Sequence, residues 1–269
     1  MDLIAQTATL DKLPYATGAS WSSKEACLPN TREALLEDIW MWINTANVKG
    51  TASIFCLTSV AGAGKSAIAH TVAQRCHDKG VLASSFFFNR EVTGRNDPKM
   101  LFSTIARDLA GRSKGLCEQI SLAIESDRSL TTASISRQFR PLILAPYLRY
   151  LTGRPVVIII DALDEGYNNK LLEILRDEIS KLPGTFRIFL TFRVIRDINK
   201  FMLQVNHICL QSIDIHEWTN LADIAIYVKH ELKNVAELQE LGDDWPDQHL
   251  ADEFTRKAEG LFLWVAMVS

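Results

Sequence analysis

The apolar positions of this chain fall into short unbroken runs, separated by longer stretches with helical spacing. In one such stretch Leu101, Ile105 and Leu109 lie on one face of a predicted helix. The runs are rich in β-branched and aromatic residues and cover residues 53–58, 82–88, 155–161, 186–192 and 207–210. Continuous apolar runs of this kind are typical of parallel strands that are covered on both faces. The pattern predicts an α/β fold: a five-stranded, mainly parallel sheet with helices on both faces, followed by a small helical segment.

The two ends of the chain differ from this predicted sheet. Residues 1–30 are rich in Ser, Thr, Pro, Gly and Ala and show no period, so we expect a lead-in or linker there. Asn30 and Glu33 have the spacing of a capping box at the start of the first helix. We expect the sheet domain to cover residues 31–213. A helical domain is expected over 214–269, and it is expected to be incomplete because the chain stops inside an apolar stretch.

The composition narrows the class of protein. The 269 residues carry a formal net charge of −3 without a basic stripe, which argues against a nucleic-acid-binding surface. No run reaches the roughly 18 apolar residues of a membrane span, and the first residues lack the basic start and apolar core of a signal peptide. The five cysteines are scattered, and Cys56 and Cys209 fall in predicted strands as small core residues. We therefore expect a cytoplasmic protein in a reducing compartment.

The first candidate site follows the first predicted strand. Residues 59–66 read Ser-Val-Ala-Gly-Ala-Gly-Lys-Ser and precede a predicted helix over 67–77, which is the layout of a phosphate-binding loop. Backbone N–H groups of such a loop and of the first helical turn point at one spot, where the helix dipole adds roughly half a positive charge. Lys65 is expected to reach the outer phosphates, and Ser66 to ligate Mg²⁺. The expected nucleotide-binding residues are Ala61, Gly62, Ala63, Gly64, Lys65, Ser66 and Ala67.

One position departs from the phosphate-loop pattern. The pattern expects glycine six residues before the lysine, and Ser59 stands there. A short serine sometimes holds the turn that leaves a strand, at the cost of added strain. Taken alone, the loop is therefore an incomplete argument for a nucleotide site.

A carboxylate at the end of another strand strengthens the prediction. The apolar run 155–161 ends in Asp161, which Asp164 and Glu165 follow closely. In open α/β sheets the ligand crevice lies at the carboxyl ends of the strands, so Asp161 is expected to hold Mg²⁺ together with Ser66. Asp164 and Glu165 are then near enough to orient or deprotonate an attacking water. The alternative is that Asp161 only caps a helix and that the acidic pair is solvated.

An arginine follows a third predicted strand. Arg193 comes directly after residues 186–192, where its side chain is expected to touch the terminal phosphate and report its presence. The alternative is that Arg193 pairs with a surface carboxylate, since Arg196 lies in the same loop. His70 and His77 lie on the helix after the phosphate loop without a second ligand pattern, so we interpret them as solvent-facing or packing residues.

With these residues in hand, the chain resembles a NACHT-type nucleotide-binding domain of the STAND class, of the fungal NOD-like kind. The most specific part of the resemblance is the acidic signature Ile-Asp-Ala-Leu-Asp-Glu at residues 160–165, beside the loop and helix at 61–69. In the sensor strand of that family Ser is more usual than Phe192. Further segments that resemble the family are residues 27–32, 85–88, 102–109, 187–193 and 260–265.

The resemblance implies ATP or another nucleoside triphosphate bound with Mg²⁺, slow hydrolysis, and a switch between closed and self-associating states. In that family the carboxylates that match Asp164 and Glu165 serve hydrolysis, and the arginine that matches Arg193 senses the terminal phosphate. STAND proteins of the NOD-like receptor type, which act in innate immunity, carry further domains, so we expect a truncated member. Two alternatives stay open: a scaffold that holds nucleotide without turnover, and a small-molecule kinase that uses the same loop.

Overall fold

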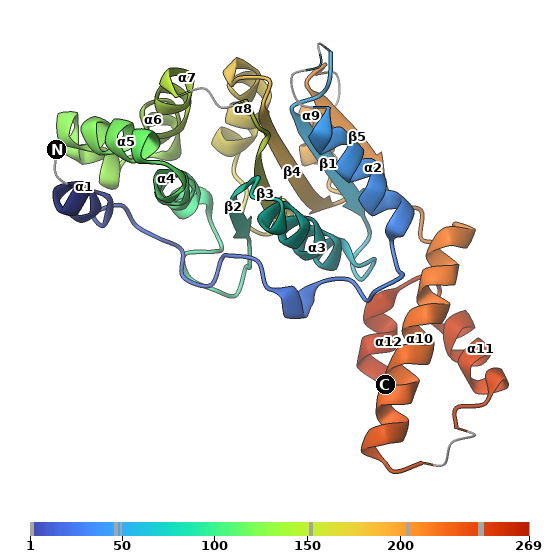
Figure 1. Ribbon diagram of the computed structural model, residues 1–269. Coiled ribbons are helices and arrows are strands. Elements are labelled where there is room, and N and C mark those ends of the chain that lie inside the picture. Colours follow the sequence, from blue (N-terminus) through green and yellow to red (C-terminus); the bar gives the residue numbers. More distant parts are fainter. Residues whose placement is uncertain are drawn as a thin grey trace.

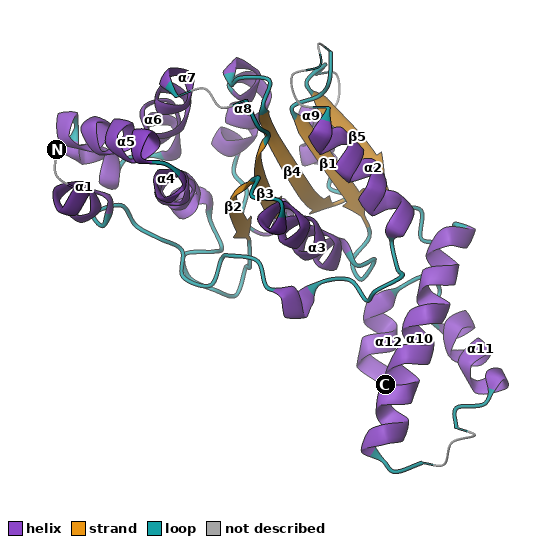
Figure 2. Ribbon diagram, viewed as in Figure 1, coloured by secondary structure: helices purple, strands orange, loops and turns teal. Residues whose placement is uncertain are grey.

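The structure of the protein, a computed structural model, describes residues 3–45, 48, 50–150, 153–202, 205–241 and 245–268. Its centre is a five-stranded sheet in the order β2-β3-β4-β1-β5, in which all neighbouring strands are parallel (Figures 1 and 2). The predicted fold class is therefore confirmed. The strands are β1 (Ile54–Ser59), β2 (Leu82–Phe87), β3 (Val156–Asp161), β4 (Phe186–Arg193) and β5 (Ile208–Ser212).

The two faces of the sheet carry separate parts of the core, because successive side chains of a strand point to opposite sides. Val157 and Ile159 of β3 pack with α2 (Glu33–Asn44) and α3 (Lys65–Asp78) on one face, whereas Ile158 joins the cluster on the other. Burial on both sides explains why the strands read as unbroken apolar runs. The core on the second face includes side chains of α4 (Leu101–Arg112), α5 (Lys114–Ser126), α6 (Ile135–Phe139), α7 (Ala145–Arg149), α8 (Asn169–Asp177) and α9 (Arg196–Met202), and α1 (Leu3–Leu10) packs on the outside of this layer.

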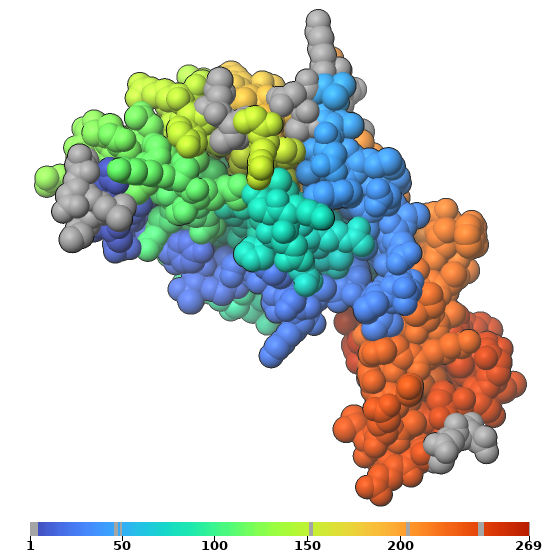
Figure 3. All heavy atoms as spheres, viewed as in Figure 1, coloured from blue at the N-terminus to red at the C-terminus, as the bar shows by residue number. Residues whose placement is uncertain are grey.

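The last three helices form a separate lobe that projects from the sheet (Figures 1 and 3). They are α10 (Trp218–Leu238), α11 (Gln248–Lys257) and α12 (Phe262–Val268). Their side chains share a core of their own, built on Ile224, Val228, Leu232, Ala251, Ala258 and Val265. None of the helices that the structure describes combines the length and the hydropathy of a membrane span.

The lead-in before α2 is ordered by contacts with the sheet domain. Its first part is the helix α1, which lies against α5. The chain then follows the edge strand β2, where the carbonyl of Ala19 accepts a hydrogen bond from the N–H of Phe87 at 2.8 Å. Further on, the N–H of Ser22 donates to Nδ1 of His70 on α3 at 3.1 Å. These contacts order the lead-in without a hydrophobic period in its sequence, because they are made by backbone groups.

Two local predictions are wrong, because contacts between distant segments determine how α2 begins and how far Cys209 is exposed. The capping box of Asn30 and Glu33 does not form: α2 begins after Arg32, whose φ of 59° is left-handed and whose side chain provides no cap. The N–H of Arg32 instead donates to Asp223 of α10 at 3.1 Å. Cys209 is exposed rather than part of the core, because β5 is an edge strand of the sheet.

His70 on α3 connects this helix to the lead-in before α2. The imidazole is 9 % exposed and stacks on Phe87 with a centroid distance of 3.9 Å and an interplanar angle of 7°. Since Nδ1 accepts the N–H of Ser22, the ring is neutral and carries its proton on the other nitrogen. Burial, followed by the charge of Arg95, lowers the pKa of His70 from 6.5 to about 4. The prediction that His70 is a packing residue fits this contact.

We expect this contact to make the stability of the protein pH-dependent. A group whose pKa is lowered on folding stabilises the protein above its unfolded pKa, and that contribution is lost as the pH falls through the folded value. The free energy of unfolding should therefore fall by up to about 3 kcal/mol between pH 6.5 and 4 on account of His70. Urea unfolding of His70→Gln, which keeps an acceptor for Ser22, should show a flatter pH profile than the wild type. Equal slopes for the wild type, His70→Gln and the exposed control His249→Gln would contradict this.

Candidate functional site

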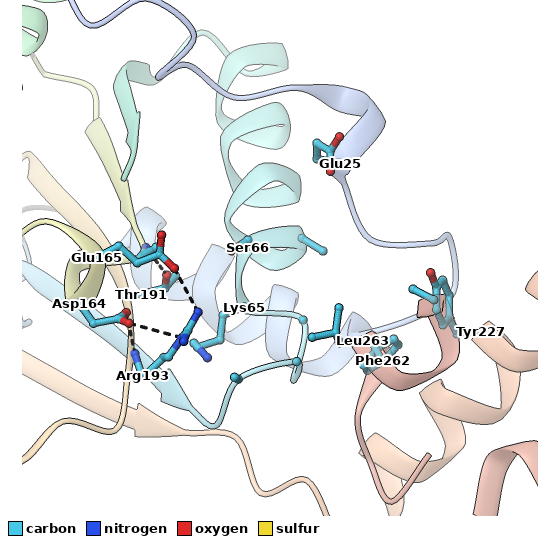
Figure 4. Close-up of a pocket in the computed structure, with 16 residues that line it drawn as sticks. Glu25, Lys65, Ser66, Asp164, Glu165, Thr191, Arg193, Tyr227, Phe262 and Leu263 are labelled. Carbon is cyan, nitrogen blue, oxygen red and sulfur yellow. Dashed lines mark hydrogen bonds and ion pairs between the residues drawn. The ribbon is translucent and has the colours of Figure 1, made fainter. Parts of the chain in front are cut away.

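The carboxyl ends of the central strands surround a cavity of about 400 Å³ (Figure 4). The loop between β1 and α3 forms one side of it, and the residues that follow β3 and β4 form another. Helices α10 and α12 close it on a third side through Tyr227, Phe262 and Leu263. Parallel strands place their carboxyl ends at one edge, so segments far apart in sequence meet here.

The loop between β1 and α3 depends on two glycines. Gly62 and Gly64 have φ values of 82° and 84°, a conformation that is costly for residues with a Cβ. A Cβ on Gly62 would also lie 3.0 Å from Cβ of Leu263 on α12. Any larger residue would therefore push the loop and α12 apart.

Ser59 is accommodated without a special backbone conformation. It is the last residue of β1 and pairs in register with Arg193 of β4, so its backbone is extended. Its hydroxyl donates to the carbonyl of Ile213 at 3.1 Å, beyond the end of β5. Glycine is not required at a strand position of this kind, and the expected strain is absent at Ser59.

The Lys65 side chain is folded into its own loop. Nζ donates to the carbonyls of Ser59 at 3.0 Å and Val60 at 2.8 Å. Burial lowers the pKa of Lys65, and the nearby carboxylates of Asp164 and Asp161 act in the opposite direction. The ammonium thus lies at the floor of the cavity with acidic groups within electrostatic reach.

Asp161 is a buried carboxylate with two hydroxyl partners. Thr191 on β4 donates to Oδ1 at 2.5 Å, and the Ser66 hydroxyl is the second hydrogen-bonding partner. Burial raises the pKa of Asp161, whereas these two bonds and the charge of Lys65 oppose that shift. Asp161 does not cap a helix, and its carboxylate lies beside the Ser66 hydroxyl at the carboxyl end of β3.

Thr191 is a site residue that the sequence analysis did not single out. It lines the cavity, is fully buried, and accepts the N–H of Ala162 at 3.0 Å while it donates to Asp161. Ala162 has a left-handed φ of 52°, which turns the chain back directly after β3. A polar residue inside an apolar strand was the available signal for Thr191. This hydroxyl fixes both Asp161 and the turn that carries the acidic pair.

The acidic pair and Arg193 form one ion cluster (Figure 4). Asp164 accepts the backbone N–H of Arg193 at 2.9 Å, and Nη2 of Arg193 donates to Glu165 at 3.1 Å. Glu165 also accepts the backbone N–H of Arg90 at 3.2 Å. Oδ2 of Asp164 is buried without a hydrogen-bond partner, although Nε of Arg193 lies within ion-pairing distance at 3.4 Å. Arg193 thus pairs with site carboxylates rather than with surface carboxylates elsewhere.

Most of the predicted site residues meet at this cavity. Ala63 and Asp161 are exceptions, since both are buried behind its wall. The remaining ones line it: Ala61, Gly62, Gly64, Lys65, Ser66, Ala67, Asp164, Glu165 and Arg193.

A second cavity of about 250 Å³ adjoins the first. The two share Glu25, Gly64, Ala67, Tyr227 and Phe262 in their walls. The rest of the second cavity is formed mainly by residues of the lead-in between 24 and 32. The sequence analysis did not single out Tyr227 and Phe262 as cavity residues, because only the packing of α10 and α12 brings them to the phosphate-loop side of the sheet.

Comparisons with known proteins support the fold and give a family. No curated protein matches the chain. The structure of C. elegans PCH-2 is similar, with a TM-score of 0.51 and 12 % identity over 98 % of this chain and 64 % of that one. A structure described as the structural basis for katanin self-assembly has a TM-score of 0.37 and 11 % identity, over 94 % of this chain and 72 % of that one. The likeness to PCH-2 shows the fold alone, and the chain spans less than two thirds of its length.

One family matches on sequence. The family described as Nephrocystin 3, N-terminal, matches residues 30–193, which is more than half of the chain. The match begins just before α2 and ends at Arg193, so it contains the phosphate loop, the acidic turn and β4. This match identifies the chain as a member of the Nephrocystin 3, N-terminal family.

Proposed function

We propose that the protein binds a nucleoside triphosphate with Mg²⁺, ATP being favoured, and hydrolyses it slowly as a STAND-type signalling switch. The observation that carries the proposal is the convergence of the glycine-containing loop, Lys65, the Asp161–Ser66 pair and the acidic turn on one cavity. These groups have complementary tasks in phosphate chemistry, and they follow two separate strands, β1 and β3.

The loop supports phosphate binding through its backbone. Gly62 and Gly64 allow close approach of the main chain, and the N-terminus of α3 offers N–H groups and its dipole. Lys65 exchanges two loop carbonyls for phosphate oxygens when the ligand enters. This movement transfers the Lys65 ammonium from neutral carbonyl oxygens to negatively charged phosphate oxygens. The nucleotide-bound state is therefore favoured.

The donor set fits Mg²⁺. This ion prefers oxygen ligands in octahedral geometry and retains several waters, so one carboxylate and one hydroxyl suffice. Asp161 and Ser66 would hold it, and the buried, unpartnered Oδ2 of Asp164 would accept a hydrogen bond from one of its waters. When bound, Mg²⁺ neutralises charge on the phosphates and so supports displacement of the terminal one.

Hydrolysis requires a group that orients water. Glu165 is the best candidate, because its carboxylate lies at the cavity wall and is 18 % exposed, whereas that of Asp164 is 2 % exposed. Arg193 pairs with both carboxylates and lies where a terminal phosphate would compete for it. A transfer of Arg193 from Glu165 to that phosphate would free Glu165 for a water molecule.

A thermal-shift comparison tests the proposal directly. A ligand that binds only the folded protein raises its Tm with the logarithm of ligand concentration. Mg-ATP should raise the Tm most, Mg-GTP less, and ATP with EDTA less than Mg-ATP. The second cavity, between the lead-in and Phe262, is the space available to the base. Absence of any shift at millimolar nucleotide would contradict the proposed function.

A nucleotide-holding scaffold without turnover is the second candidate. The observation that favours it is the engagement of Glu165 by both Arg193 and the backbone of Arg90. ATP hydrolysis above a Lys65→Ala background would exclude this candidate. A small-molecule kinase is less favoured, because an acidic pair after the strand suits water activation better than transfer to a metabolite.

The wider role is proposed from the resemblance to NACHT domains. In this proposal residues 31–213 form the nucleotide-binding domain, 214–269 belong to a helical domain, and nucleotide state controls self-association. A cytoplasmic location belongs to the same proposal. Size-exclusion chromatography with light scattering in ADP and in a non-hydrolysable ATP analogue tests self-association.

Replacing Arg193 should reduce discrimination between ATP and ADP. Arg193→Gln removes the guanidinium that would contact the terminal phosphate, and hydrogen bonds to charged groups contribute about 1.5–3 kcal/mol. We expect the ratio of the Kd for Mg-ADP to that for the Mg-ATP analogue to fall by about tenfold or more. Isothermal titration calorimetry measures both constants, with exposed Arg196→Gln as the matched control. An unchanged ratio in Arg193→Gln would show that Arg193 does not sense the phosphate.

A further inference from the structure

A buried arginine joins three segments of the chain behind the phosphate loop. Arg32 precedes α2, is 7 % exposed, and donates through Nη2 to the carbonyl of Ala63 at 2.9 Å and to Oδ1 of Asn220 at 2.5 Å. Its Nε lies 3.8 Å from a carboxylate oxygen of Asp223, which also accepts the Arg32 N–H at 3.1 Å. One guanidinium therefore contacts the loop and helix α10 together.

Asn220 links Arg32 to the turn that precedes α12. It is 1 % exposed, and its Nδ2 donates to the carbonyls of Ile215 at 2.7 Å and Gly260 at 3.0 Å. Gly260 has a φ of 82°, and a Cβ there would lie 2.1 Å from the carbonyl oxygen of Ile215. The amide of Asn220 thus uses both its oxygen and its nitrogen to tie Arg32 to the α10–α12 lobe.

Helix α12 reaches the phosphate loop from the same side. The ring of Phe262 lies 4.8 Å from the guanidinium carbon of Arg32. The N–H of Leu263 donates to the carbonyl of Gly62 at 3.3 Å. The carbonyls of two successive loop residues, Gly62 and Ala63, are therefore held by groups outside the loop.

The orientation of these carbonyls sets the orientation of the loop N–H groups. In a planar trans peptide the N–H points opposite to the C=O. When Arg32 holds the oxygen of Ala63, the N–H of Gly64 is directed the other way, and Gly64 lines the cavity. The contact of Leu263 with Gly62 acts in the same manner on the N–H of Ala63. Arg32 can thus determine whether the loop presents its donors to phosphate.

We propose that Arg32 is a positioning residue of the phosphate loop and that, through Asn220, it couples nucleotide binding to the docking of the α10–α12 lobe. This inference rests on the proposed nucleotide site. Coupling between two sites is reciprocal, so nucleotide strengthens the attachment of the lobe as much as the attached lobe strengthens nucleotide binding. Asn220 lies beyond the residues 30–193 that the family match covers.

Affinity measurements on arginine variants test the positioning role. With Mg-ADP as the probe in calorimetry, Arg32→Gln should bind at least about tenfold more weakly than the wild type. Arg32→Lys should behave similarly, because an ammonium keeps the charge but lacks the planar fork that spans Ala63 and Asn220. Arg187→Gln is the matched control. That arginine is 1 % exposed, lies over the ring of Trp42 and donates to the carbonyls of Gly184, Phe186 and Thr45.

The outcomes separate the two proposals. Wild-type affinity in Arg32→Lys would mean that charge alone matters, and an equal loss in Arg187→Gln would mean that general destabilisation explains the effect. Either result overturns the positioning role while leaving the proposed function intact. A wild-type protein that binds no nucleotide overturns both.

Hydrogen exchange tests the coupling. Mg-ADP should slow exchange in α10 and α12 of the wild type, and this protection should disappear in Asn220→Ala, which keeps the contact of Arg32 with Ala63. Arg32→Lys, measured in the same way, gives a second test if Asn220→Ala already detaches the lobe without nucleotide. Nucleotide-induced protection of α10 and α12 that persists in both variants would overturn the coupling.

Discussion

Lys65→Ala should weaken Mg-ATP binding by at least about a hundredfold, a loss on the order of 3 kcal/mol. The substitution removes the one ammonium that lies in the phosphate loop, where Nζ contacts the carbonyls of Ser59 and Val60. In the bound state that ammonium would contact phosphate oxygens through charge-assisted hydrogen bonds, which are stronger than bonds between neutral groups. Calorimetry with Mg-ATP measures the loss.

The control for Lys65→Ala must distinguish an effect at the phosphate loop from an effect on helix α3, which begins at Lys65. Lys79→Ala removes an exposed lysine just after the other end of α3 and should leave the affinity unchanged. Circular dichroism and thermal unfolding establish that Lys65→Ala still folds without its two loop hydrogen bonds. If Lys65→Ala binds Mg-ATP within about threefold of the wild type, the phosphate site lies elsewhere in the protein.

Glu165→Gln should leave nucleotide binding nearly unchanged and slow hydrolysis by about 10²–10⁴-fold, the range that a positioned general base contributes. The amide keeps an oxygen that can accept from Arg193 or from the N–H of Arg90, so the local structure is retained. It cannot take a proton from water, and it carries no negative charge toward Arg193. Single-turnover hydrolysis with excess enzyme measures the chemical step, and calorimetry measures binding.

Glu173→Gln on α8 is the matched control, because it removes a carboxylate that pairs with exposed Lys170 and lies outside the cavity lining. Turnover in Glu165→Gln equal to that of the wild type would show that Glu165 has no role in the chemistry. Asp164→Asn would then decide whether the other carboxylate serves as the base. A wild type that never exceeds the Lys65→Ala background would leave the scaffold as the better description.

The sheet was predictable because the apolar runs in the sequence match the burial of the strands in the folded protein. Every residue of β1 and of β3 is buried, and each strand is covered on both faces, so the apolar runs directly reflect the layers. The loop that contains Gly62 and Gly64 was predictable for a different reason. Its backbone conformation restricts the residue types at those positions, and such restrictions are visible in sequence.

The prediction failed where contacts involve backbone groups or distant elements. Nothing in the composition of residues 3–30 reveals that Ser22 donates to His70, since a backbone N–H has no residue-type signature. Thr191 is a polar residue in an apolar strand, but the sequence does not reveal that its hydroxyl joins Asp161 to Ala162. Ser59 seemed a defect of the loop only because its strand pairing could not be anticipated.

By itself, the sequence determined the α/β class, the position of the glycine-containing loop after β1 and the edge of the sheet at which the acidic residues lie. These features follow from periodicity and from the chemistry of single positions, which are local properties. Only the tertiary structure decided that Arg193 pairs with Asp164 and Glu165, and that Arg32 joins the loop to Asn220 on α10. Those contacts depend on how segments far apart in sequence pack together. The local pattern of residues does not specify that packing.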